Sequence, residues 1–310
     1  MRNELLSAAY LSVDQSKAER LQECGELLRF KKGEDGRKTL DFMTSCRVRL
    51  CPMCSWRRSL KTFFNTDSIV RHVSEKKRYR YLLLTLTVRN CTGENLSSEI
   101  DNIFAGFNRL LQLAAVKRAV KGGMRTLEVT HNTEYGKAAF DTYHPHLHVL
   151  LAVNPSYFTS AAYISHEKWR DMWQKSCRLD YAPEVSIKAV KPRKNGALYE
   201  RSDAEAETRE AVAEVSKYAV KDADFIIPDD WDLSVDAVRT LDAALNNRRL
   251  ISYFGIFKTA KAELQLEDEE SGDLIHVGDD LQNVDEVFTM VEYGWYSGAR
   301  EYYRTRQYQR

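Results

Sequence analysis

Two runs of apolar and β-branched residues mark the middle of the chain. Residues 81–88 and 147–153 are nearly continuous in such side chains, which predicts two buried strands. Residues 124–130 alternate between polar and apolar side chains and predict a third strand. Glu128 lies between Leu127 and Val129, so it points away from the apolar face of that strand.

Helical periodicity recurs between and after these strands. An apolar stripe from Ile100 to Ala114 predicts a helix that opens at residues 97–101 and stops at Gly122-Gly123. The remaining elements are expected as a helix at 163–177, a short strand at 185–190, a helix that opens at Ser202 and carries residues 214–221, and a loop followed by a helix within 225–247.

Length and composition favour a sizeable globular protein. The chain has 310 residues, no apolar run long enough for a membrane span, and an N-terminus without the plan of a signal peptide. We therefore expect a cytoplasmic protein without a membrane partner, whose six cysteines are reduced or bound to metal.

The net charge of +1 conceals a segregation of charge. Residues 263–292 hold eleven acidic residues and no Lys or Arg, which leaves 46 basic and 34 acidic residues elsewhere. Basic runs lie at 47–61, 71–80 and 188–194. The excess of basic residues outside this segment suits a polyanionic partner, although runs of charged residues also occur on ordinary solvated surfaces. The arginines near residue 50 are candidates for phosphate contacts.

His146 and His148 are the strongest candidates for chemistry. They alternate along a predicted strand, so both imidazoles project from one face and make half of a divalent-metal site. One carboxylate would complete a facial triad. The alternative is a pair of hydrogen-bonded histidines on a solvated sheet face.

Glu128 is the expected third ligand. If the loop between the two strands is centred on Lys137, antiparallel pairing places Glu128 opposite His146. A shift of one residue would turn Glu128 to the other face, so His144, His131 and Asp141 remain rival ligands. Thr85 and Thr87 share a strand face and could lie beside the metal, bind a phosphate or pack against a neighbouring strand.

Four cysteines form a second candidate site. Cys24, Cys46, Cys51 and Cys54 have the spacing C-x21-C-x4-C-x2-C, which predicts a structural zinc site with four thiolate ligands. The alternative is four reduced cysteines, some of them simply buried. Cys91 and Cys177 lack matching neighbours and are expected in the core.

The predicted helix around residues 214–221 carries the candidate nucleophile. Glu214 and Tyr218 are four residues apart, and so are Lys217 and Lys221, on a neighbouring face. A tyrosine over a metal-bound phosphate could attack it, with a lysine favouring the phenolate and Glu214 activating water. The non-catalytic alternative is an amphipathic helix with a buried tyrosine.

Four segments in this order resemble one family: the rolling-circle replication initiator (Rep) proteins of small bacterial plasmids, which are HUH endonucleases. The segments are residues 83–90, 144–150, 214–221 and the cysteine block 51–58, and residues 248–258 are also similar. The similarity covers roughly residues 24–277.

The resemblance implies a function. It implies an α+β fold with an antiparallel sheet flanked by helices, joined here by an N-terminal four-cysteine zinc module. His146 and His148 would bind catalytic Mn²⁺ or Mg²⁺, and Tyr218 would become linked to the 5′-phosphate of a nicked strand. In the subgroup with one tyrosine and a nearby glutamate, Glu214 would activate water, and Lys221 would support Tyr218.

The expected organisation has three parts: a cysteine-rich segment at 1–58, a nicking and joining nuclease at 59–224 and an extension at 225–310. Single-stranded and origin DNA are the expected partners, with a host helicase and polymerase as candidates. Rival functions are an HUH transposase or relaxase and a non-catalytic, zinc-containing DNA-binding regulator. The aromatic and basic end, residues 293–306, could stack with single-stranded DNA, form a packed helix or be a disordered tail.

Overall fold

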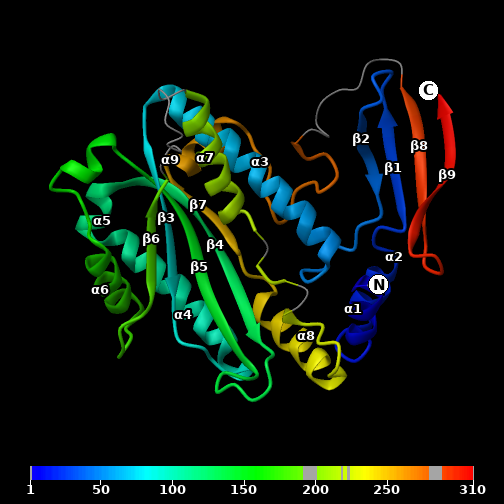
Figure 1. Ribbon diagram of the computed structural model, residues 1–310, viewed down its shortest axis with the longest axis horizontal. Coiled ribbons are helices and arrows are strands. Elements are labelled where there is room, and N and C mark those ends of the chain that lie inside the picture. Colours follow the sequence, from blue (N-terminus) through cyan, green and yellow to red (C-terminus); the bar gives the residue numbers. More distant parts are fainter. Residues whose placement is uncertain (1, 191–200, 218, 222–223, 279–287, 310) are drawn as a thin grey trace. The chain divides into compact units, whose positions relative to one another are not determined.

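The computed structural model describes residues 2–190, 201–217, 219–221, 224–278 and 288–309 (Figure 1). The chain forms two compact units. Unit 1 comprises residues 1–64, 221–246 and 267–310, and unit 2 comprises residues 65–220 and 247–266. Each unit is assembled from segments far apart in the sequence. None of the helices in the described part of the chain is long and apolar enough to cross a membrane.

Helices and strands alternate irregularly along the chain. The helices are α1 (Arg2–Tyr10), α2 (Gln15–Glu23), α3 (Pro52–Lys76), α4 (Gly93–Gln112), α5 (Ala114–Ala119), α6 (His166–Cys177), α7 (Arg201–Val215), α8 (Trp231–Leu245) and α9 (Ile256–Glu263), with a 3-10 turn η1 at Pro155–Thr159. The strands are β1 (Leu27–Lys32), β2 (Lys38–Met43), β3 (Arg80–Thr87), β4 (Val120–Asn132), β5 (Thr142–Val153), β6 (Val185–Ala189), β7 (Ile251–Gly255), β8 (Thr289–Tyr296) and β9 (Glu301–Gln309).

Unit 2 is built on a five-stranded antiparallel sheet with the order β6-β3-β5-β4-β7. The two apolar runs of the sequence form β3 and β5, which lie next to each other in the middle of this sheet (Figure 1). Their buried positions include Leu82, Leu84, Leu147 and Val149. The predicted α+β class with an antiparallel sheet flanked by helices is confirmed.

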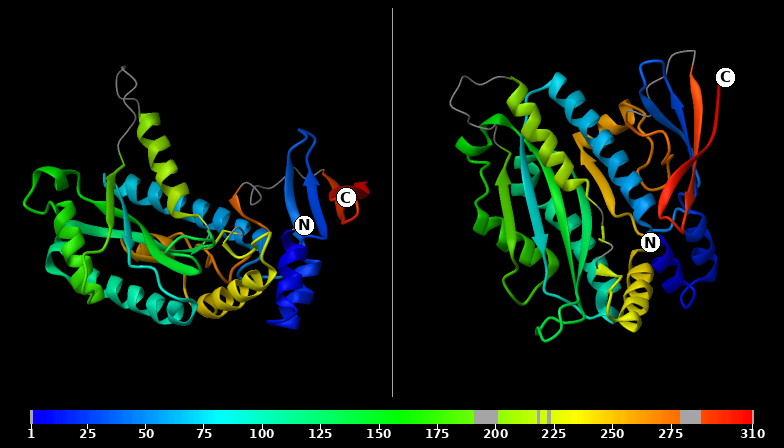
Figure 2. Two further views of the ribbon diagram at one scale, coloured as in Figure 1. Left: turned by 60° about the horizontal axis from the view of Figure 1, so that its bottom comes forward. Right: turned by 45° about the vertical axis from the view of Figure 1, so that its right-hand side comes forward.

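Helices cover both faces of this sheet (Figure 2). On one face, α4 places Phe107 against Phe254 of β7, and the guanidinium of Arg125 from β4 lies over the Phe104 ring. On the other face, the hydroxyl of Thr66 from α3 forms a hydrogen bond with the hydroxyl of Tyr253 from β7, with the two oxygens 2.9 Å apart. This second face also carries the histidine pair, since His146 and His148 alternate with the buried residues of β5.

Unit 1 contains a four-stranded sheet with the order β2-β1-β8-β9. The β1–β2 hairpin pairs with a hairpin from the end of the chain, because β1 runs antiparallel to β8. The aromatic and basic end of the chain is therefore a strand pair. Helices α1, α2 and α8 contact one another in the same unit, where Tyr10 donates to the buried carboxylate of Asp242 at 2.6 Å.

Two predicted element boundaries are wrong. Gly122 and Gly123 lie inside β4 and do not end a helix. A Cβ on Gly123 would lie 2.0 Å from the Leu150 carbonyl oxygen, so the close approach of β5 requires glycine there.

The helix that was predicted to carry residues 214–221 ends earlier. Helix α7 stops at Val215, and residues 216–217 and 219–220 form turns and bends. The backbone of this segment joins the sheet, because the Val129 N–H of β4 donates to the Ala219 carbonyl at 2.7 Å. A tertiary contact of this kind can override the local helical propensity. Glu214 and Lys217 are still close, but Lys217 and Lys221 do not share a helical face.

Candidate metal centres and active site

The β4–β5 hairpin brings Glu128 beside the histidine pair. The register pairs Glu128 with His146 and Asn132 with Thr142, so the loop is centred on Lys137 as predicted. Directly paired residues of antiparallel strands share a face, and His148 follows two residues after His146 on the same face. The predicted register is confirmed.

The three side chains converge at ligand distances. Glu128 Oε2 lies 2.9 Å from His148 Nε2 and 3.7 Å from His146 Nε2. Ligands of one ion at about 2.1 Å each would be about 3 Å apart when adjacent, so these separations fit a shared metal. The side chains are 12% to 19% exposed, so the group is partly accessible to solvent. Two imidazoles and one carboxylate form the donor set of a facial triad.

The other ring nitrogen of each histidine has its own partner. His146 Nδ1 lies 3.1 Å from the His144 carbonyl oxygen, so a proton on Nδ1 leaves Nε2 free to bind metal. His148 Nδ1 lies 3.5 Å from Thr85 Oγ1 of β3, which is the strand residue paired with His148. Thr85 therefore lies beside a candidate metal ligand, which is the first of the alternatives given for it above. The sequence could not predict the carbonyl partner of His146, because every residue type has a backbone carbonyl.

The electrostatics of the group favour an ionised carboxylate. Burial raises the pKa of Glu128, but hydrogen bonds and charge interactions with His146 and His148 outweigh burial and hold this pKa well below its usual range. Burial and the neighbouring His146 lower the pKa of His144, which keeps that imidazole neutral. A neutral imidazole and a carboxylate are the protonation states in which these groups bind metals.

The rival ligands lie elsewhere. His144 stacks on His146 with ring centroids 5.2 Å apart, but it is outside the group of three. His131 pairs with Tyr143 in the register, on the opposite face of the hairpin, and its Nε2 lies 3.0 Å from Asp141 Oδ1. His131 and Asp141 thus satisfy each other away from the histidine pair.

Replacing Glu128 by Ala is expected to weaken Mn²⁺ binding by at least about 100-fold, because one of three protein ligands is lost. Titration calorimetry with the full chain measures this change. Glu134→Ala is the matched control, since Glu134 lies in the loop of the same hairpin and is well exposed. Equal Mn²⁺ affinities in the two variants would remove Glu128 from the ligand set.

Local backbone geometry places the four cysteines. Helix α2 ends with Cys24 as its cap, and Gly25 follows with φ +79°, the left-handed conformation that turns the chain toward β1. Cys51 directly precedes Pro52, the first residue of α3, and Cys54 lies in the first turn of that helix. Cys46 comes from the loop between β2 and α3. All four are buried and none is in a disulfide.

The sulfur positions fit a tetrahedral metal. Cys24 Sγ lies 3.5 Å from Cys51 Sγ and 3.6 Å from Cys54 Sγ, and Cys46 Sγ lies 3.7 Å from Cys54 Sγ. Four thiolates at about 2.3 Å from zinc would be about 3.8 Å apart. Hydrogen bonds from the other three thiols hold the pKa of Cys54 well below its usual range, which favours a thiolate there. Cys91 and Cys177 lie outside this cluster. Cys177 is buried as predicted, but the prediction of a core position is wrong for Cys91, which is half-buried.

The remaining predicted catalytic residues are Glu214, Tyr218 and Lys221. Glu214 is half-exposed in the last turn of α7, and its Oε2 lies 2.5 Å from Lys217 Nζ. Lys221 belongs to unit 1, where its backbone N–H donates to Asp224 Oδ2 at 2.9 Å. Tyr218 lies outside the described residues. Its neighbour Ala219 pairs with Val129, one residue from Glu128.

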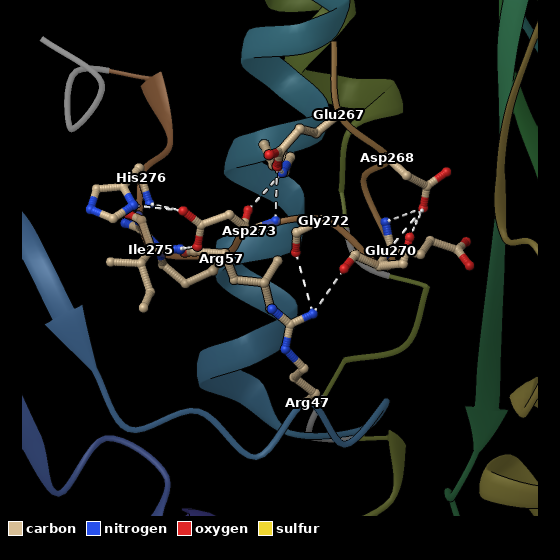
Figure 3. A network of polar contacts seen from close by, with 12 residues as sticks. Arg47, Arg57, Glu267, Asp268, Glu270, Gly272, Asp273, Ile275 and His276 are labelled. Atoms are coloured by element: carbon tan, nitrogen blue, oxygen red, sulfur yellow. Dashed lines mark hydrogen bonds and ion pairs between the residues drawn. The ribbon is translucent and has the colours of Figure 1, made fainter.

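The basic residues around the cysteines have partners within unit 1. Figure 3 shows Arg47 and Arg57 beside the segment around residues 267–276, which belongs to the acidic region. Arg57 donates to the carbonyls of Leu274 and Ile275, and Lys61 Nζ lies 2.5 Å from Glu267 Oε2. Both cations are buried. The expectation of phosphate contacts is therefore wrong for Arg57: its guanidinium holds the acidic segment in place.

Comparison with known proteins gives a consistent result. A family model described as "Replication protein" matches residues 37–303. A "Protein rep" of Bacillus amyloliquefaciens is 41% identical over 298 residues, which cover 92% of this chain and 84% of that protein. A "Protein rep" of Streptococcus pneumoniae is 38% identical over 84% of this chain and 76% of the relative, and a "Replication protein" of Staphylococcus aureus is 34% identical over 71% and 88%. The comparison with solved structures found no match.

The fold and the two clusters define an α+β protein with a four-cysteine module and a separate histidine–carboxylate group. The family match covers well over half of the chain, and the relatives are aligned over most of their own length. The chain belongs to the replication protein family.

Proposed function

We propose that this protein initiates rolling-circle replication of a plasmid by nicking and rejoining one strand at the origin. One observation carries the proposal most directly. The Val129 N–H binds the Ala219 carbonyl, which ties the segment after Tyr218 to the strand that presents Glu128.

Glu128, His146 and His148 would hold a divalent cation, Mn²⁺ or Mg²⁺. The cation, when bound, supplies positive charge that stabilises the developing negative charge on a phosphate. The carboxylate and the two imidazoles fix its position because β3, β4 and β5 hold their backbones in one sheet. The four cysteines would hold a structural Zn²⁺ in unit 1.

Tyr218 would act as the nucleophile in a transesterification. Its phenolic oxygen loses its proton and forms a bond to the scissile phosphorus, while the bond from phosphorus to the 3′ oxygen breaks. The leaving oxygen takes up a proton and becomes a free 3′-OH that can prime synthesis. The ordinary pKa of a tyrosine is about 10, so the phenolate needs nearby positive charge. Lys221 is the candidate from the chain.

Glu214 would act in the terminating step. A carboxylate can take a proton from water, whose oxygen then attacks the phosphotyrosine and releases Tyr218 and a free 5′-phosphate. The half-exposed position of Glu214 at the end of α7 gives water access to its carboxylate. The present partner of Glu214 is Lys217, whose Nζ donates to the Glu214 carboxylate at 2.5 Å.

Replacing Glu214 by Ala is expected to separate the two steps. The covalent adduct should still form, while its hydrolysis slows by about 100-fold or more, the contribution of a general base. Single-turnover cleavage of a labelled origin strand, with the adduct followed on a denaturing gel, measures both rates. Glu210→Ala is a suitable control, because Glu210 is exposed one turn earlier on the same helix. Unchanged adduct hydrolysis would assign the water-activating role to another group.

Two rival functions make different predictions. A transposase or relaxase of the HUH type would share the chemistry and differ in its DNA substrate, and the family membership favours replication. A non-catalytic DNA-binding regulator would bind origin DNA without cleaving it. The expected three-part division at residues 58 and 224 stays a prediction about function, as do the DNA, helicase and polymerase partners.

A further inference from the structure

The sheet face that carries the histidine pair extends beyond it to the edge strand β6. Thr85 of β3 pairs with His148 on one side and with Ser186 of β6 on the other. Leu83 pairs in the same way with Leu150 and Lys188. Because directly paired residues share a face, Ser186 and Lys188 project from the same face as His148. Figure 1 shows β6, β3 and β5 side by side in this order.

Register gives the distance of these two residues from the metal candidates. Neighbouring strands lie about 4.8 Å apart, so the Cα of Ser186 is about 10 Å from that of His148. Lys188 is two residues further along β6, at about 12 Å. The flexible stem of lysine lets its ammonium reach back along the face. An extended strand of DNA with one phosphate at the histidine pair would place a neighbouring phosphate within this range.

Strand β6 is held firmly along its length. The Thr87 N–H and Oγ1 both donate to the Glu184 carbonyl, at 3.3 and 2.9 Å. At the other end, the Val190 N–H donates to the Tyr81 carbonyl at 3.0 Å. His166 of α6 lies 2.6 Å from the Val185 carbonyl through its Nε2. These contacts fix the backbone of Ser186 and Lys188 relative to the histidine pair.

Both side chains point into solvent. Ser186 and Lys188 are exposed, while Val185 and Ile187 of the same strand are buried or half-buried. Within the described residues, neither side chain takes part in a hydrogen bond or ion pair. An ammonium and a hydroxyl on one exposed face offer a charge-assisted donor and a neutral donor, which are groups that contact phosphate oxygens.

We propose that Ser186 and Lys188 form a subsite for a phosphodiester of single-stranded DNA, next to the scissile phosphate. This inference rests on the proposed function, since it takes DNA as the substrate. The ammonium of Lys188 provides the electrostatic part of the contact, and the hydroxyl of Ser186 donates a hydrogen bond. Such contacts position a strand without reading its bases. The subsite therefore sets the register of the scissile phosphate over the histidine pair.

A different role for Lys188 follows from its place on an edge strand. Charged residues at sheet edges, lysine above all, prevent pairing with a second molecule. In that role Lys188 would have no specific partner on the DNA. The two roles differ in whether the effect of Lys188 depends on one particular phosphate.

A double-substitution cycle on protein and DNA tests the subsite. The binding partner is a single-stranded origin oligonucleotide in which one phosphate at a time is replaced by an uncharged methylphosphonate. The protein is the full chain carrying Tyr218→Phe, so binding is measured by fluorescence anisotropy without cleavage. Lys188→Ala is compared with Lys188→Arg and with Lys175→Ala, an exposed lysine on α6.

We expect Lys188→Ala to weaken binding roughly fivefold and to reduce the salt slope of log Kd by about 0.7, the value for one phosphate contact on a single strand. Lys188→Arg should keep most of the affinity, and Lys175→Ala should leave it unchanged. One methylphosphonate position should weaken binding to the Lys188 protein and have no further effect on Lys188→Ala. Additive effects at every position would overturn the subsite.

The same experiment separates this inference from the proposed function. Suppose that the effects of Lys188→Ala and of one methylphosphonate on binding are non-additive, but the protein with Tyr218 intact never cleaves the strand. The subsite is then supported and the proposed nicking activity is contradicted. If cleavage occurs and no phosphate couples to Lys188, the nicking activity stands and the subsite is wrong.

Discussion

Replacing Tyr218 by Phe is expected to abolish the covalent adduct between the protein and its DNA, with a loss of about 10⁴-fold or more in strand cleavage. The phenolic oxygen is the atom that would bond to phosphorus, and phenylalanine keeps the ring while removing that oxygen. The ligand group of Glu128, His146 and His148 is untouched by the change. Mn²⁺ affinity should therefore stay the same while adduct formation disappears.

The matched control for this variant is Tyr135→Phe. Tyr135 is an exposed tyrosine in the β4–β5 loop, outside the group of three ligands. Cleavage by Tyr135→Phe should equal that of the unchanged protein on a denaturing gel. Adduct formation that survives in Tyr218→Phe would mean that another residue is the nucleophile.

Replacing Cys51 by Ser is expected to remove the bound zinc and to destabilise unit 1 by several kcal/mol. Structural zinc sites contribute their binding energy to folding, and Cys51 is fully buried among the other three sulfurs. Metal analysis should find about one zinc per chain in the unchanged protein and close to none in the variant. Thermal unfolding of both proteins measures the loss of stability.

Cys91→Ser controls for the general effect of changing a cysteine. Cys91 is half-buried and lies outside the four-cysteine cluster. Its zinc content should stay at about one per chain. A zinc-free yet fully folded protein would contradict the four-thiolate assignment, and so would a Cys51→Ser variant that retains its metal.

The centre of unit 2 could be predicted from local pattern. Alternation alone showed which residues of β5 share a face, and a loop centred on Lys137, one of the registers the sequence allowed, paired Glu128 with His146. Both inferences need only the period of a strand and the symmetry of a hairpin. The third ligand could be selected from its rivals only with the structure, because His131 and Asp141 pair with each other on the other face.

The sheet of unit 1 could not be predicted in this way. Strand β1, residues 27–32, mixes leucines and lysines without clear alternation, and its partner β8 lies more than 250 residues away in the sequence. Long-range pairing leaves no local signal. The contacts of the acidic region could not be predicted either. Composition shows the charge of this region, but it does not show that Glu267 pairs with Lys61.

The end of α7 shows where local propensity fails. Residues 214–221 have good helical spacing, yet the chain leaves the helix after Val215. The backbone contact between Ala219 and Val129 joins this segment to β4, and such a contact is invisible to a single-segment prediction. The contact also ties Ala219 to β4, the strand that carries Glu128.

The most direct test of the account is the polarity of the protein–DNA linkage. A single-stranded origin oligonucleotide is labelled at its 5′ end in one sample and at its 3′ end in another, and both are incubated with the protein and Mn²⁺. The account predicts that only the 3′ label migrates with the protein on a denaturing gel, because Tyr218 retains the 5′-phosphate of the downstream fragment. Protein-bound 5′ label, or no adduct with either label, would contradict it.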